Sequence, residues 1–277
     1  MTPKVAVVGH VEWGEFAVVE RVPAPGEIVH ARDTFSLAAG GGAVAAVQLA
    51  KLGGEATFFT ALGADDLGDI AVAELHAPGV GLEAARRGAT RRVFTFLSDD
   101  HERTITVLGE RLVPHAADAL PWDTLATCDA VYFTGGDVEA LHHARRARWL
   151  VATPRALDTL RAARIRVDVL VASATDPGEQ VPLGLLDPEP RFVVLTRGAE
   201  GGEWRGEEDR TGRWAAEALP GEPVDAYGCG DAFAAGITHG LGATDDLGEA
   251  LALAARCGAH ALCGRGPYAG QLELRAS

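Results

Sequence analysis

The sequence is poor in several features that mark particular classes of protein. Its four cysteines, Cys128, Cys229, Cys257 and Cys263, form no Cys-x-x-Cys pair, and no histidine stands at a zinc-finger spacing from them. This argues against a structural zinc site. No apolar window approaches the roughly 20 residues of a membrane span. The N-terminus shows no basic-then-apolar signal pattern. We therefore expect a cytoplasmic protein with reduced thiols and no membrane partner.

Positive charge is also scarce. The net charge is −14, and the only basic run that stands out is the short segment 145–148. Binding driven by a nucleic-acid backbone is therefore disfavoured. An acidic protein that binds an anionic ligand needs local neutralisation, which a metal ion, a helix N-terminus or backbone amides can supply.

Segments typical of strands and helices alternate along the chain. An apolar run at 4–9 opens the sequence as a buried strand, and a small-residue helix is expected over 43–52. Further on, strands are predicted at 130–134, 150–153, 167–173 and 192–196, and helices at 137–149, 156–164, 231–240 and 247–262. Such alternation favours parallel strands joined by right-handed crossovers. With 277 residues, we expect one α/β domain over residues 1–277.

Two β-prone segments are of a different kind. Residues 91–97 and 103–108 alternate polar and apolar side chains and are joined by the polar bend 98–102. This pattern predicts a hairpin with one face exposed or covering something else. We interpret it as part of a small lid or a dimerising sheet.

The segment 224–236 carries the strongest indication of chemistry. Gly228 and Gly230 leave the backbone uncovered, and Asp231 then begins an alanine-rich helix. Amides at a helix start, together with the helix dipole, suit the oxygens of a transferring phosphoryl group. A carboxylate there can accept the proton of an attacking hydroxyl. The competing interpretation is that Asp231 is only a helix N-cap and Gly-x-Gly only a tight turn.

Residues 225–231, Asp-Ala-Tyr-Gly-Cys-Gly-Asp, resemble the second signature of the ribokinase (PfkB) family of carbohydrate and nucleoside kinases. Other family features recur in the family's order. These are the glycine turn 40–42 with Ala-Lys-Leu-Gly at 50–53, Gly-Ala-Asp-Asp-Leu-Gly at 63–68, Ser-Ala-Thr-Asp at 173–176 and Leu-Thr-Arg-Gly-Ala-Glu-Gly at 195–201. The resemblance covers roughly residues 4 to 268.

The resemblance implies a three-layer α/β/α ribokinase-like fold with a mostly parallel central sheet and a small β lid from segments near 13–36 and 91–108. It implies an ATP-dependent kinase that phosphorylates a hydroxyl of a small carbohydrate-like or nucleoside-like acceptor. A homodimer through the lid would also be typical. By the same resemblance Asp231 is the catalytic base, and Gly228, Cys229 and Gly230 form the anion hole. The nucleotide would contact Ser173, Thr196, Gly198, Gly201, Gly228, Gly230 and Cys263. Asp176 would help hold Mg²⁺, and Asp225, with carbonyls over 263–266, is a candidate for a monovalent cation such as K⁺.

The acceptor side departs from the family's pattern. Glu12 and Gly14 stand where many sugar kinases have Asn-x-Asp, and Val44 stands in place of a substrate-binding Asn. Two polar groups that hold sugar hydroxyls are thus missing, and a pocket must match the polarity of its substrate. We expect an unusual acceptor or a pocket rebuilt with His10, Glu12 and Arg103. The expected substrate-binding set is Glu12, Gly40, Gly41, Gly42, Val44, Arg103 and Asp231.

These departures leave a second hypothesis open, namely a catalytically weak ligand-binding or regulatory protein on a kinase scaffold. Ser173 and Asp176 also replace the family's Asn and Glu near the metal. Fold alone does not choose between enzyme and binding protein. The first hypothesis is favoured because base and anion hole are kept.

Several single features have alternative interpretations. Cys229 is either a small packing residue or, at a helix start, a thiol of lowered pKa. Asp65 and Asp66 are either a carboxylate pair or helix caps. Arg103 could reach the substrate or pair with Glu102 or Asp100.

Two further patterns are weak. The match of residues 40–45 to a dinucleotide-binding fingerprint follows a poor strand at 34–39. The adjacent His142 and His143 point in different directions on a helix, which favours a solvated face over a metal site.

Overall fold

The computed structural model describes residues 2–53, 55–99, 103–180, 182 and 184–274. Its centre is a nine-stranded sheet in the order β13-β12-β11-β10-β9-β8-β1-β4-β5. The strands from β11 to β5 are parallel, while β12 and β13 are added antiparallel at one edge. The strands are β1 (Lys4–Val8), β4 (Glu55–Leu62), β5 (Gly81–Arg86), β8 (Ala130–Phe133), β9 (Trp149–Ala152), β10 (Val169–Ser173), β11 (Phe192–Thr196), β12 (Gly202–Gly206) and β13 (Thr211–Trp214).

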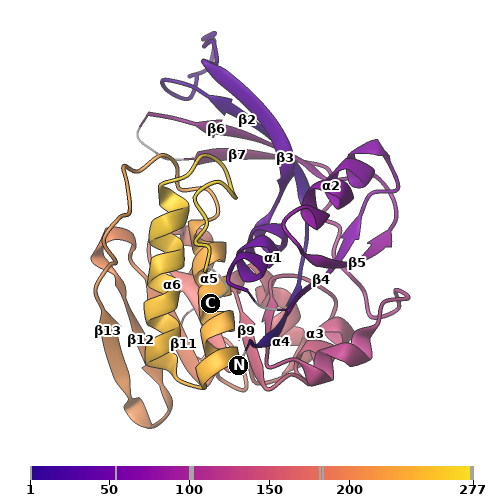
Figure 1. The fold of residues 1–277 in the computed structure, drawn as a ribbon, viewed down its shortest axis with the longest axis vertical. Helices are drawn as coiled ribbons and strands as arrows, with labels where there is room; N and C mark the ends of the chain where they lie inside the picture. Colours follow the sequence, from indigo (N-terminus) through magenta and orange to yellow (C-terminus); the bar gives the residue numbers. More distant parts are fainter. Residues whose placement is uncertain (1, 54, 100–102, 181, 183, 275–277) are drawn as a thin grey trace.

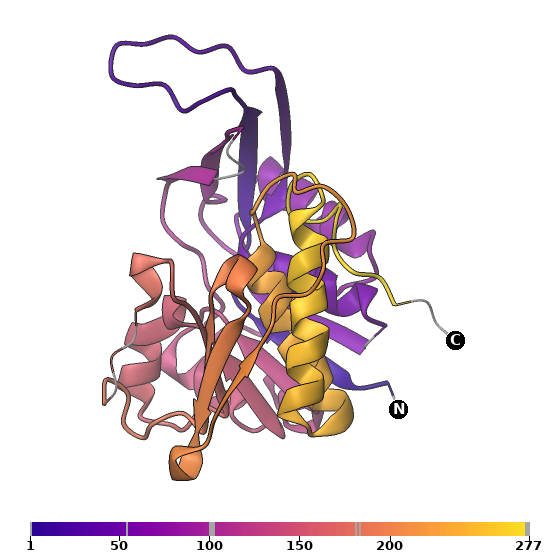
Figure 2. The same cartoon turned by 90° about the vertical axis from the view of Figure 1, so that its left-hand side faces the viewer.

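Helices cover both faces of this sheet, as Figures 1 and 2 show. Val5 and Val7 of β1 pack into a core with α1, α2, α5 and α6, while Ala6 and Val8 pack into a second core with α3 and α4. This alternation follows from the two-residue side-chain period of a strand buried on both faces. The expected three-layer α/β/α fold is confirmed. The helices are α1 (Gly41–Lys51), α2 (Asp66–His76), α3 (Val138–Ala144), α4 (Leu157–Ala163), α5 (Cys229–Thr244) and α6 (Leu247–Leu262).

A second sheet stands apart from the central one, at the top of Figures 1 and 2. It has the order β3-β2-β6-β7, and we call it the lid sheet. Its strands are β2 (Glu12–Val18), β3 (Asp33–Ala39), β6 (Arg92–Leu97) and β7 (Arg103–Leu108). The proposed bend between β6 and β7 includes residues 100–102, which lie outside the described residues. β7 is one of the two edge strands of this sheet and is exposed along its length. A homodimer through this sheet stays a prediction.

Two expectations about local structure were wrong. Residues 34–39 form most of β3, because they pair antiparallel with β2 over a full seven-residue register. The helix expected over 137–149 ends at Ala144, and Trp149 already belongs to the buried strand β9, opposite Ala130. In both places pairing with a distant strand decides the structure over local propensity.

Among the described residues, no helix combines the length and the apolar character needed to cross a membrane.

Candidate active site

The candidate site lies where the parallel strands end and α5 begins. His10 follows β1, Ser173 ends β10, Thr196 ends β11, and Asp231 is in the first turn of α5. Carboxyl ends of parallel strands share one edge of a sheet, which is where open α/β folds place their ligands. Chain segments far apart in sequence therefore converge here.

The turn before α5 leaves two amides without a partner. Gly228 has a φ of 82°, a left-handed conformation that glycine adopts without strain, and it brings the chain sharply into the 16-residue helix. No described residue accepts a hydrogen bond from the amide of Gly230 or Asp231. A Cβ added at Gly230 would meet nothing within 4 Å. Two donors at the positive end of a helix dipole thus have no acceptor among the described residues.

Asp231 lies between this turn and the start of α1. A Cβ added at Gly41 would lie 2.5 Å from its Oδ1, so only glycine fits there without displacing the carboxylate. The hydroxyl of Tyr132 in β8 donates to Oδ1 at 3.4 Å. Burial, and secondly the charge of Glu179, raises the pKa of Asp231 to about 6. The positive charge of Arg103, the hydrogen bond from Tyr132 and the charge of Arg155 act in the opposite direction.

The predicted nucleotide residues lie at the ends of β10 and β11. Ser173 and Thr196 are register partners in these adjacent parallel strands. The Thr196 hydroxyl donates to the carbonyl of Ala172 at 3.3 Å. Beyond Thr196 the chain turns through a short 3₁₀ helix, Gly198–Glu200, and Gly201 takes a φ of 81° before β12.

Acidic side chains border this region and are tied to one arginine. Arg155, which follows β9, forms ion pairs with both Asp176 and Glu179, and its Nε lies 3.0 Å from Glu179 Oε1. Glu179 Oε2 also accepts from the amide of Ser173 at 2.9 Å. The negative charge of Glu179 also raises the pKa of Asp231.

Asp225 is buried and organises the loops on either side of α5 and α6. Its Oδ1 accepts from the amide of Tyr227 at 2.9 Å, and its Oδ2 accepts from the amide of Gly266 at 2.7 Å. Burial raises the pKa of Asp225, and the two backbone hydrogen bonds partly counter this. The carboxylate thereby joins the turn before α5 to the chain after α6. Its role toward a monovalent cation stays a prediction.

The predicted acceptor side holds a cluster of polar groups, in which His10 and Glu12 are buried and Arg91 and Arg111 are partly buried. Arg111 Nη2 lies 2.9 Å from His10 Nδ1, and Arg91 Nε lies 3.3 Å from Glu12 Oε2. A Cβ added at Gly40, whose φ is 94°, would lie 3.2 Å from both His10 and Glu12. Burial, together with the charges of Arg111 and Arg91, lowers the pKa of His10 well below its usual range, so the ring is neutral. Burial raises the pKa of Glu12, against the effect of Arg91.

The remaining predicted acceptor residues have different positions. Val44 is fully buried and lies beneath the turn before α5, where a Cβ added at Gly228 would be 2.9 Å from its Cγ1. A Cβ at Gly42 would be 2.6 Å from the carbonyl oxygen of His10, so this residue allows α1 to approach β1. Arg103 at the start of β7 is exposed, and its charge lowers the pKa of Asp231. The partners considered for it, residues 100 and 102, lie outside the described part of the chain.

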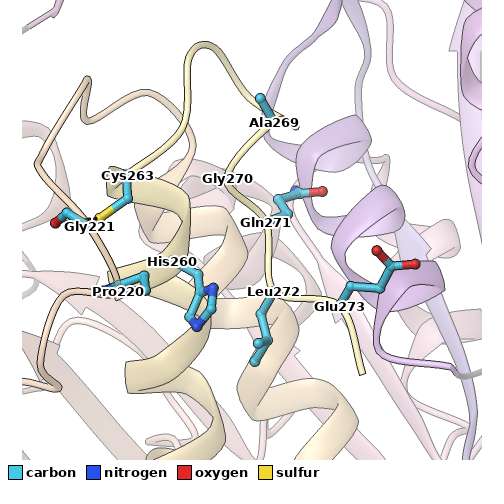
Figure 3. A pocket seen from close by; sticks show the side chains of 9 residues that line it. All are labelled: Pro220, Gly221, His260, Cys263, Ala269, Gly270, Gln271, Leu272 and Glu273. Carbon is cyan, nitrogen blue, oxygen red and sulfur yellow. Dashed lines mark hydrogen bonds between the residues drawn. The ribbon is translucent and has the colours of Figure 1, made fainter. Parts of the chain in front are cut away.

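Cys229, at the start of α5, is partly buried and packs against neighbouring apolar residues. Burial raises the pKa of Cys229 to about 12, so the packing interpretation holds and a lowered pKa does not. The Cys263 thiol donates to the carbonyl of Gly221 at 3.3 Å. Cys263 lines a separate cavity of about 590 Å³ between the end of α6 and the chain that follows it, shown in Figure 3. Asp231 does not line that cavity.

Three alternative interpretations can now be decided. Asp65 is the N-cap of α2, accepting from the amide of Gly68 at 2.9 Å, as the capping interpretation predicts. His142 is exposed, but His143 is partly buried and stacks on Trp122, so the solvated-face interpretation is right for one of them only. The strand before the glycine turn 40–42 is β3 of the lid sheet, which is not the parallel βαβ context of a dinucleotide-binding fingerprint.

Comparison with known proteins decides the family. The chain matches the family described as "pfkB family carbohydrate kinase" over residues 2–177 and 179–273. The chain belongs to this family. As a pfkB-family protein it is an ATP-dependent phosphotransferase with a sugar-like acceptor.

Relatives and solved structures agree with the pfkB assignment. An ATP-dependent ribose-1-phosphate kinase from Halopiger xanaduensis is 28% identical over 274 residues, covering 92% of this chain and 90% of that protein. A putative ribokinase from Agrobacterium tumefaciens superimposes with a TM-score of 0.81 at 19% identity, covering 98% of this chain and 95% of that one. An Arabidopsis thaliana ribokinase complexed with ribose and ATP superimposes with a TM-score of 0.75 at 19% identity, over 98% and 96% of the two chains.

Five residues around this pfkB-family site were missed by sequence reasoning: Tyr132, Glu179, Arg91, Arg111 and Arg155. Arg155 follows a predicted strand directly, and a residue in that position is expected at the ligand-binding edge, so this signal was available. Tyr132 sits inside a buried strand and has the pattern of a core residue. Arg91 and Arg111 flank the lid hairpin, and no neighbouring sequence pattern indicates that they lie near the site.

Proposed function

We propose that the protein transfers the γ-phosphoryl group of ATP to a hydroxyl of a small carbohydrate acceptor, with Asp231 as general base. The observation that carries this proposal is that the Asp231 carboxylate and the amides of Gly230 and Asp231, which have no hydrogen-bond partner among the described residues, lie at the same helix start. A base and an anion hole at one helix start are the two elements that phosphoryl transfer to an alcohol needs.

In this proposal the Asp231 side chain and the two backbone amides have different roles in phosphoryl transfer. The Asp231 carboxylate accepts the proton of the acceptor hydroxyl as its oxygen attacks the phosphoryl group. The two amides then donate to the oxygens on which negative charge collects. A carboxylate with a pKa of about 6 is ionised at neutral pH, yet it is more basic than an ordinary aspartate. Tyr132 and Gly41 fix its position.

The residues present fit a nucleotide with Mg²⁺. The described residues contain no group of three or more His, Cys, Asp or Glu arranged as a metal cage. Mg²⁺ in phosphotransferases is held mainly by substrate phosphates and water, with one or two carboxylates. Asp176 and Glu179, in the segment that follows β10, would supply such carboxylates. When bound, the ion neutralises charge on the transferring group.

The decisive experiment measures acceptor-dependent release of ADP across a panel of sugars, sugar phosphates and nucleosides. We expect at least one acceptor to be turned over, and Asp231→Asn to lower its kcat by about 10²–10⁴-fold. Asp158→Asn, an exposed change on α4, serves as the matched control. Binding of nucleotide and acceptor without any ADP release would refute the proposal and favour the ligand-binding alternative.

A further inference from the structure

The chain that follows α6 contacts the lid sheet at two points along strand β3. Near the end of the strand, the hydroxyl of Tyr268 donates to the carbonyl of Ala38 at 2.7 Å. At its start, Arg265 Nη2 lies 2.6 Å from Asp33 Oδ2, and the guanidinium carbon lies 4.2 Å from the centre of the Phe35 ring. Figure 1 shows this segment, in yellow, beside the lower edge of the lid sheet. The lid strand is therefore held by residues about 230 positions away in the sequence.

Arg265 can make both of its contacts because the backbone beside it lies directly against the lid. Gly266 has a φ of 64°, and a Cβ added there would lie 3.0 Å from the Phe35 ring. A guanidinium is planar, so it can lie over an aromatic ring while its edge pairs with a carboxylate. Phe35 in turn stacks on Phe16 of the neighbouring strand β2, with ring centres 4.7 Å apart. The contact therefore reaches the apolar core of the lid sheet.

The same segment is fixed to the turn before α5. The buried Asp225 carboxylate accepts from the amides of Gly266 and Tyr227, at 2.7 and 2.9 Å. Phe16 of the lid sheet meets the Tyr227 ring edge-on, with ring centres 5.1 Å apart. The contacts form a closed circle, which runs from Asp225 through Gly266 and Phe35 to Phe16 and returns through Tyr227. A movement of the lid sheet therefore changes the contacts of the turn before α5.

The ion pair at the edge of this circle is its most exposed contact. The side chains of Arg265 and Asp33 are 46% and 51% exposed, whereas Phe16, Asp225 and Tyr227 are buried. We propose that Arg265 is a positioning residue, which latches strand β3 to the segment after α6 and so holds the lid sheet in place beside the turn before α5.

The consequence for catalysis rests on the proposed function. Glu12 begins β2 and Gly40 directly follows β3, so the latched strands carry residues of the predicted acceptor side. Ser173 and Thr196, the predicted nucleotide residues, lie instead at the ends of β10 and β11. Loss of the latch should therefore affect use of the acceptor more than binding of ATP. An exposed ion pair and an exposed cation–π contact each contribute up to about fivefold in an equilibrium constant, so their joint loss should cost about 3- to 20-fold.

The test is a double-mutant cycle read out by ADP release, with ribose as acceptor, or ribose 1-phosphate if ribose is not turned over. We expect Arg265→Ala to lower kcat/KM for the acceptor about 3- to 20-fold and to change KM for ATP less than about twofold. Arg265→Lys keeps the charge without the planar group and should recover part of the loss. Because both side chains belong to one contact, adding Asp33→Asn to Arg265→Ala should cause no further loss. Arg161→Ala, an exposed arginine on α4, is the matched control.

Other kinetic results would overturn the proposal. Losses that simply add in the double variant would show that Arg265 and Asp33 act independently, and equal kinetics in Arg265→Ala and the wild type would show that the contact is idle. A larger effect on KM for ATP than on the acceptor would assign Arg265 to nucleotide binding instead.

Hydrogen exchange of the ligand-free protein separates the latch from the proposed kinase activity. The amides of β3 exchange when this edge strand opens, which the latch should oppose. We expect Arg265→Ala to speed exchange in peptides covering 33–39 at least about threefold, with unchanged exchange in β10 and β11 and an unchanged melting temperature. If no acceptor yields ADP, the proposed function fails, but this result would still support the latch. Unchanged exchange of β3 would end it, whatever the activity.

Discussion

Replacing Asp231 by asparagine should lower kcat by about 10²–10⁴-fold and at the same time stabilise the fold. Burial and the nearby Glu179 hold the carboxylate where its charge is disfavoured, which raises its pKa from the ordinary 3.8 to about 6. One pKa unit corresponds to about 1.4 kcal/mol, so a shift of about two units corresponds to about 3 kcal/mol. Because Asp231 is partly exposed, we take about 1–3 kcal/mol as the gain from removing the charge.

The gain depends on pH in a defined direction. Below about pH 4 the carboxyl is protonated in both the folded and the unfolded chain, and its ionisation affects neither. Between about pH 4 and pH 6 the unfolded chain loses the proton while the folded protein keeps it, so stability falls as pH rises. Asparagine never ionises. The difference in the free energy of unfolding between Asp231→Asn and the wild type therefore grows between about pH 4 and pH 6 and stays constant above about pH 6.

The assay is urea unfolding of the ligand-free protein at pH 8 and at pH 4, combined with ADP release at pH 8. We expect Asp231→Asn to be about 1–3 kcal/mol more stable than the wild type at pH 8, with a much smaller difference at pH 4, and to lose about 10²–10⁴-fold in kcat. The control Asp158→Asn should stay within about 0.5 kcal/mol at both values. A variant that is less stable at pH 8, or equally shifted at both pH values, would show that the carboxylate is not held at an energetic cost.

Other predictions concern neighbours of the same carboxylate. Gly41→Ala should lower kcat at least about tenfold while changing the free energy of unfolding by no more than about 1 kcal/mol, because its Cβ would lie 2.5 Å from Asp231 Oδ1. Unfolding and ADP release together check this, and unchanged activity would contradict it. Glu179→Gln should move the acidic limb of the kcat/KM profile to lower pH, since the Glu179 charge raises the pKa of Asp231, whereas Asp176→Asn should leave that limb in place. A shift of the acidic limb in Asp176→Asn, with none in Glu179→Gln, would show that Asp176 and not Glu179 acts on the pKa of Asp231. The Cys229 thiol, with a pKa of about 12, should react with iodoacetamide at pH 8 more than about 100-fold more slowly than an ordinary thiol, as mass spectrometry can measure. Rapid labelling would show that the thiol is not buried as described.

The start of α5 could be predicted from sequence because its chemistry is local. Glycines at 228 and 230, followed at once by Asp231 and an alanine-rich helix, determine a sharp turn and free amides within a few residues. The buried strands of the central sheet were equally visible, since β-branched and apolar residues run without interruption in β10 and β11. These local sequence patterns predict the structure correctly because it does not depend on residues far away in the sequence.

The acceptor cluster could not be predicted in the same way. His10 and Arg111 are separated by 101 positions and touch only because the lid sheet returns the chain to the end of β1. The hairpin of β12 and β13 was missed for a related reason. Its first strand begins and ends in glycine, so its propensity is poor, and antiparallel pairing to β11 forms it.

The two halves of the site are built from different parts of the fold. Glu12 and Arg103 belong to the lid sheet, and Arg91 immediately precedes its strand β6, whereas the amides near Asp231 belong to the helix that packs on the central sheet. If the proposed roles hold, substitutions at these lid positions should change which acceptor is recognised without disturbing the turn before α5. This separation allows the chain to depart from the family pattern at Glu12 while keeping the Gly-x-Gly-Asp sequence, whereas Val44, in α1 beneath the turn before α5, lies against that turn itself.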